Sequence, residues 1–118
     1  MITDLISRLL ALPLVEGAIF LAAGIFVLIF PPQKINSLYG YRTAASMRSQ
    51  PAWHFAQKFA AKMLIFTGSF LLLFSMLGLL FEPGKTVELV TGIVVTLLSV
   101  AFILYATEKA ISEQFPKS

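Results

Sequence analysis

Three long apolar runs constrain this chain more than any other feature of its sequence. They cover about residues 14–30, 63–81 and 87–107, and each has about the length that an α-helix needs to cross a bilayer, roughly 20 residues. Hydrophobic residues make up 58% of the chain and charged residues 13%, so the chain cannot present a normal soluble surface. We therefore predict an all-α membrane protein with three transmembrane helices, in one membrane domain over residues 1–118.

Residues 1–12 precede the first run and have the period of an amphipathic helix. Because Pro13 lacks an N–H group and resists a continuous helix, we predict a short interfacial helix that turns at Pro13 into the first span. A secretory signal peptide is the alternative, but the run is too long for its apolar region and no small-residue cleavage site follows. At the other end, residues 108–118 are predicted to form a short charged tail.

Glu16 is an ionisable residue inside the first apolar run. A carboxylate in hydrocarbon is costly, which makes Glu16 a candidate intramembrane polar site for a proton or a ligand. Its place in the first turn of the span also suits an interfacial carboxylate, near headgroup water and the positive end of the helix dipole. Both interpretations stay open at the level of sequence.

The stretch between the first two runs, residues 31–62, is basic and contains no acid. It holds five Lys or Arg residues and the only histidine of the chain: Lys34, Arg42, Arg48, Lys58, Lys62 and His54. Because this charge is concentrated beside membrane spans, anionic lipids are the expected partner and nucleic acid is not. We predict a structured basic loop with short helices.

Local signals divide this basic stretch into turns and helix starts. Thr43 can cap a short helix, and Ser49 or Gln50 can begin the next helix with Pro51 in its first turn. A continuous helix over residues 51–81 would be about 46 Å long, so its first turns should project from the hydrocarbon into the interface.

Basic residues also predict the orientation of the chain through the positive-inside rule. The basic loop and the tail together hold seven Lys or Arg residues, whereas the opposite side holds only Arg8 and Lys85. We therefore expect the loop and the C-terminus in the cytoplasm, and the N-terminus and the turn at residues 82–88 outside.

Several residues of the basic loop together form a recognisable motif. Its elements are Asn36, Tyr39-Gly40-Tyr41-Arg42-Thr43, Ser46-Met47-Arg48, and Trp53 shortly before Ala56-Gln57. This combination resembles the signature of the SdpI family of bacterial integral membrane proteins. The resemblance covers about residues 31–59. The chain departs from the family at Gln57, where Asn is common, and it is shorter than the family's founding member, which has more spans.

The resemblance implies a multi-pass protein of the bacterial cytoplasmic membrane that acts by binding, in immunity to, or sensing of, a membrane-active peptide or toxin. The implied binding residues are Asn36, Tyr39, Gly40, Tyr41, Arg42, Thr43, Ser46, Arg48, Trp53 and Gln57. The alternative is an accessory subunit of a larger membrane complex. Small residues on the predicted spans suit packing against other subunits, and they also suit a homodimer.

Individual side chains of the motif have ordinary structural interpretations as well. Arg42 offers a planar fork of donors for a lipid phosphate or a carboxylate, or it can serve as a headgroup anchor. Asn36 can cap a turn through its own backbone instead of binding a ligand. Trp53 can anchor at the membrane interface instead of stacking on a ligand.

The sequence offers no arrangement of residues typical of an enzyme. No Ser/His/Asp or paired-carboxylate constellation can be assembled, and no glycine-rich phosphate loop follows a strand. The chain has no cysteine and one histidine, whereas zinc takes three or four protein ligands. We therefore predict a protein without enzymatic activity, cofactor or metal.

Overall fold

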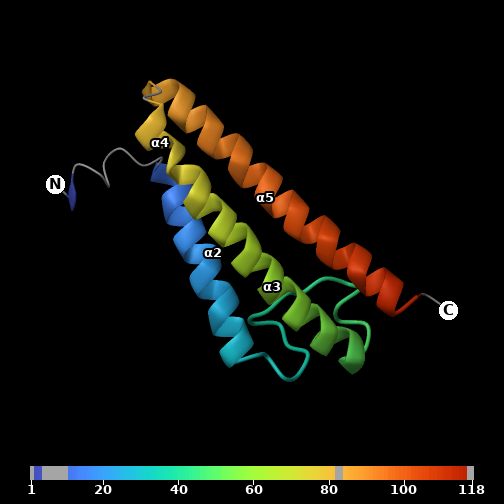
Figure 1. The fold of residues 1–118 in the computed structure, drawn as a ribbon. Helices are drawn as coiled ribbons and strands as arrows, with labels where there is room; N and C mark the ends of the chain where they lie inside the picture. Colours follow the sequence, from blue (N-terminus) through green and yellow to red (C-terminus); the bar gives the residue numbers. More distant parts are fainter. Residues whose placement is uncertain (1, 4–10, 82–83, 117–118) are drawn as a thin grey trace.

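The computed structural model describes residues 2–3, 11–81 and 84–116. Its helices are α2 (Ala11–Ile29), α3 (Gln50–Ser75), α4 (Leu77–Leu80) and α5 (Lys85–Gln114), and the described residues contain no strand. The molecule is elongated, with extents of 54 × 25 × 20 Å. Figure 1 shows α2 and α3 side by side, with α5 running along the other side of α3.

Within the described part of the chain, three helical segments are long and apolar enough to cross a membrane: α2, Gln50–Leu80 and α5. Most of their large apolar side chains point outward and are exposed, as expected for helices whose surroundings are lipid. The predicted all-α class with three candidate membrane spans is confirmed.

The first span differs from the prediction at its start. The helix α2 begins at Ala11 and runs through Pro13, which lies in the first turn, where a missing N–H group costs no helical hydrogen bond. The turn predicted at Pro13 is therefore wrong. The interfacial helix predicted over residues 1–12 falls largely outside the described residues.

The start of α3 follows its local sequence signals. The backbone N–H of Ala52 donates to the side chain of the N-cap residue Ser49 at 3.2 Å, and Pro51 lies in the first turn. The helix then continues without a break into the second span and is interrupted only near Met76, before α4. Part of the turn predicted after this span, residues 82–83, lies outside the described residues.

Two other predicted boundaries are wrong. The short helix expected after Thr43 is a turn over residues 44–47. The charged tail predicted from residue 108 is instead helical as far as Gln114. The helix continues because its buried stripe continues: Ile111 is completely buried.

Glycine brings α2 and α3 into direct backbone contact. A Cβ atom on Gly68 would lie 2.7 Å from the backbone nitrogen of Leu21 and 2.8 Å from the carbonyl oxygen of Gly17. A Cβ atom on Gly24 would lie 2.7 Å from the carbonyl oxygen of Ala61. Any larger side chain at these positions would push the two helices apart, so α2 and α3 form a closely packed pair.

The helix α5 joins this pair near its own first turns through a small residue and polar contacts, among them a hydrogen bond from the Ala11 N–H to Glu88 at 3.1 Å. A Cβ atom on Gly92 would lie 2.6 Å from the Leu12 side chain, so α5 approaches α2 closely there. The Thr96 hydroxyl lies 2.5 and 2.6 Å from the two carboxyl oxygens of Glu16. Glu16 therefore contacts α5 inside the bundle.

Candidate functional site

The segment between α2 and α3, residues 30–49, is named here the connecting loop. Figure 1 shows that it lies at the end of the bundle where α3 begins and α5 ends. It contains most of the motif residues, and Trp53 and Gln57 follow it on α3. The helices therefore bring the motif to one end of the molecule.

Gln57 holds the middle of the connecting loop against α3. Its side chain is 2% exposed. Its Oε1 atom accepts a hydrogen bond from the Tyr41 backbone N–H at 2.7 Å, and its Nε2 atom donates to the Tyr41 carbonyl at 2.8 Å. One amide thus satisfies both backbone groups of one residue, which fixes the position of Tyr41 over the helix.

Gly40 precedes Tyr41 and permits this close approach. Its φ angle is +106°, in the region that favours glycine. A Cβ atom at this position would lie 2.7 Å from Oε1 of Gln57 and 2.8 Å from Cγ of Pro32. Both the backbone conformation and the space therefore require glycine.

Thr43 and Ser46 close a tight turn by bonding each other. The Thr43 backbone N–H donates to Oγ of Ser46 at 2.8 Å, and the Ser46 backbone N–H donates to Oγ1 of Thr43 at 3.2 Å. Ser46 is completely buried, and its hydroxyl lies 3.0 Å from the carbonyl oxygen of Tyr41. The two side chains thus serve the backbone of the loop itself, like the reciprocal bonds of a helix cap.

Glu108 on α5 belongs to this site, although the sequence analysis assigned it only to the tail. Its Oε2 atom accepts hydrogen bonds from the Tyr41 hydroxyl at 2.8 Å and from the Thr43 hydroxyl at 2.9 Å. Burial raises the pKa of Tyr41 above its ordinary value, and the nearby Glu108 carboxylate adds to this. The available sequence signal was weak: an acid directly after an apolar run, on the same side as the basic loop.

Trp53 is completely buried, and its indole N–H donates to the Pro32 carbonyl at 2.5 Å. This burial contradicts its interpretation as an interfacial anchor, because the ring is enclosed by protein.

Asn36 accepts hydrogen bonds from the backbone N–H groups of Leu38 and Tyr39 at 2.8 and 2.9 Å. Its side chain therefore caps a turn, which was the alternative to ligand binding.

Among the predicted binding residues, the side chains of Arg42, Arg48 and Tyr39 stay exposed. The Arg42 guanidinium donates to the Ser37 carbonyl at 2.6 Å, and Tyr39 donates to the Phe30 carbonyl at 3.3 Å. Each guanidinium has five N–H donors, so donors remain for a ligand after these bonds.

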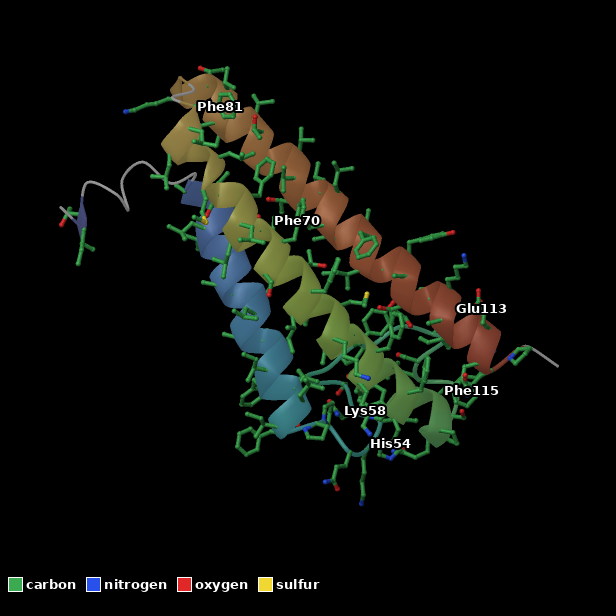
Figure 2. The ribbon with its side chains drawn as sticks, viewed as in Figure 1. His54, Lys58, Phe70, Phe81, Glu113 and Phe115 are labelled. Carbon is green, nitrogen blue, oxygen red and sulfur yellow. The ribbon has the colours of Figure 1, made fainter. Side chains whose placement is uncertain are left out.

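The end of α5 is also attached to α3 beside the connecting loop. The Phe115 ring packs edge-on against Phe55, with 5.8 Å between ring centroids. Figure 2 shows Phe115 near this end of the bundle, where His54 and Lys58 also lie. The Arg48 guanidinium donates to the Phe115 carbonyl at 2.5 Å. Loop, α3 and α5 therefore meet here.

An apolar cavity of about 370 Å³ lies between the three spans, next to the connecting loop. Phe20 of α2, Ala61 of α3 and Val100 of α5 contribute to its walls, and Gly40 and Tyr41 line it from the loop. Of the predicted binding residues, Gly40, Tyr41 and Gln57 line this cavity. Glu16 does not line it, and its contact with Thr96 lies elsewhere on α2 and α5.

Comparison with known proteins gives two matches. The family described as the SdpI/YfhL protein family matches residues 33–106. The chain is also 46% identical over 55 residues to the uncharacterized protein YfhL of Bacillus subtilis (strain 168). That alignment covers 47% of this chain and 50% of YfhL, so the chain matches about half the length of this relative. No solved structure matches.

Proposed function

Because the chain belongs to the SdpI/YfhL protein family, we propose that this multi-pass membrane protein acts by binding and gives immunity to, or senses, a membrane-active peptide. The match to YfhL supports the family, and that relative is itself described as uncharacterized. The proposal of a peptide ligand therefore depends on the geometry of the site.

The apolar cavity beside the connecting loop is the observation that carries this proposal. Its volume of about 370 Å³ is within the range of ligand sites, roughly 300–1,000 Å³. All three spans and the loop contribute to its lining. A peptide that has entered the bilayer could place a large apolar side chain there without leaving the hydrocarbon.

Tyr41 connects such a binding event to the connecting loop. It lines the cavity, and its backbone and hydroxyl are bonded to Gln57 of α3 and Glu108 of α5. A side chain entering the cavity would press on a residue that joins two helices and the loop. We propose that the outer turn and the spans intercept the peptide, and that the loop reports the bound state on the cytoplasmic side.

A peptide-challenge experiment tests this function. A bacterial strain is grown with and without the chain in the presence of a panel of membrane-active peptides. Val100→Phe narrows the cavity, and Val94→Phe is the matched control, because both residues lie exposed on α5 and only Val100 is in the lining. We expect Val100→Phe to raise sensitivity to one peptide about tenfold, equivalent to about 1.4 kcal/mol of binding, and Val94→Phe to keep full protection.

Unchanged survival across the panel when the chain is removed would contradict the proposed function. Equal protection by both variants would show that the cavity takes no part in this function. Constant co-migration of the chain with foreign subunits in mild detergent would instead favour the accessory-subunit alternative.

A further inference from the structure

We propose that a second pocket, between the connecting loop and α5, binds the phosphodiester headgroup of an anionic membrane lipid. The pocket has a volume of about 720 Å³. Its lining includes Ala44, Ala45 and Arg48 from the loop, and Tyr105, Glu108 and Lys109 from α5. This headgroup pocket is distinct from the apolar cavity, with which it shares no lining residue.

Arg48 and Lys109 give the headgroup pocket two cations from different elements. The bond between the Arg48 guanidinium and the Phe115 carbonyl holds the fork beside the end of α5. Its remaining N–H groups suit the oxygens of a phosphate, for which planar forks are well matched. The Lys109 ammonium lies 5.9 Å from the centre of the Tyr105 ring. Both cationic side chains are exposed and can reach a ligand.

Glu108 determines which ligand charge matches the lining of the headgroup pocket. Its Oε2 atom is already held by the hydroxyls of Tyr41 and Thr43. Two cations and one carboxylate in the lining leave one net positive charge. A phosphodiester carries a single negative charge, so it matches this lining better than a doubly charged phosphate monoester.

The position of the headgroup pocket on α5 indicates a lipid as the source of the phosphodiester. Tyr105 is 67% exposed, and Phe102 and Leu98 are exposed about one and two turns before it on the same helix face. Tyrosine commonly lies at headgroup level, with apolar residues reaching into the hydrocarbon. A lipid could therefore lay its acyl chains along this face and its headgroup in the pocket.

Native mass spectrometry of the detergent-purified chain tests the proposal with two probes, palmitoyl-oleoyl phosphatidylglycerol and the corresponding phosphatidylcholine. We expect the phosphatidylglycerol to bind more tightly. Arg48→Gln and Lys109→Gln should each weaken its binding about tenfold, since each removes a charge-assisted hydrogen bond. Lys58→Gln is the matched control, because Lys58 is exposed on α3 at the same end of the bundle and does not line the pocket.

Two further measurements separate this proposal from its alternatives. Ala44→Leu fills the pocket without changing its charge and should also weaken binding of phosphatidylglycerol. Dimethyl phosphate at millimolar concentration should compete poorly, because it lacks acyl chains. The proposal is overturned by equal binding of the two lipids, by full binding in Lys109→Gln, by full binding in Ala44→Leu, or by strong competition from dimethyl phosphate.

Discussion

Gln57, Ser46 and Asn36 illustrate a shared property of the motif at the scale of single residues. Each was predicted to bind a ligand, and each uses its side chain to bond the backbone of the connecting loop. Buried polar groups must be satisfied in this way, because leaving one unpaired costs about 1–3 kcal/mol. The motif therefore encodes the shape of the loop, and substitutions within it should act first through that shape.

Gly40→Ala should destabilise the connecting loop by about 1–3 kcal/mol, because alanine at a positive φ is strained and its Cβ would collide with Gln57. Trp53, the only tryptophan, is buried against the loop, so its fluorescence reports loop docking during denaturation in micelles. Gly84→Ala is the control, since a Cβ there meets nothing within 4 Å. Equal midpoints for the two variants would show that the loop does not depend on the Gly40 conformation.

Alkaline pH should release the connecting loop through Tyr41. The pKa of Tyr41 is raised in the folded state, mainly by burial and further by Glu108. The folded protein therefore holds this proton more tightly than the unfolded chain, whose tyrosine pKa is about 10. The stabilisation is complete below about pH 10 and is lost as pH rises toward the raised value.

This loss is measured as a change in Trp53 fluorescence at alkaline pH, compared with absorbance at 295 nm. Tyr41→Phe should reduce the pH dependence, and Tyr105→Phe should retain it, because Tyr105 is exposed on α5. A wild-type chain in which all tyrosines ionise together near pH 10 would contradict this assignment.

At the scale of helices, local signals located the start of α3 better than the end of α5. Ser49 and Pro51 mark a helix start by their own chemistry, whatever surrounds them. The end of α5 depends on the burial of Ile111, which arises from packing that no local pattern encodes. The contact of Glu108 with Tyr41 was missed for the same reason: the two residues are 67 positions apart.

Gly68→Val should destabilise the α2–α3 pair by about 1–3 kcal/mol through overpacking, because its side chain would meet the backbone of α2. Ser69→Val is the control, since Ser69 is the next residue and is exposed. The loss of helical circular dichroism during titration with a denaturing detergent measures the difference. A midpoint for Gly68→Val equal to that of Ser69→Val would mean that the helices do not approach at this point.

At the scale of the whole molecule, the orientation in the membrane stays a prediction from the basic residues. The chain contains no cysteine, so single cysteines can be introduced without background labelling. We expect an impermeant thiol reagent to label Gly84→Cys in intact cells, and Ser37→Cys only after the membrane is opened. External labelling of Ser37→Cys would reverse the predicted topology and place the connecting loop outside the cell.

The two bonds to Glu108 also determine when the loop can form during synthesis. Tyr41 and Thr43 leave the ribosome long before Glu108, which lies 67 and 65 positions later in the chain. A nascent chain that stops before α5 would therefore carry the complete motif but leave both hydroxyls without their carboxylate. Such truncated products should be degraded faster than chains that contain α5, because only α5 supplies the carboxylate that both hydroxyls bond.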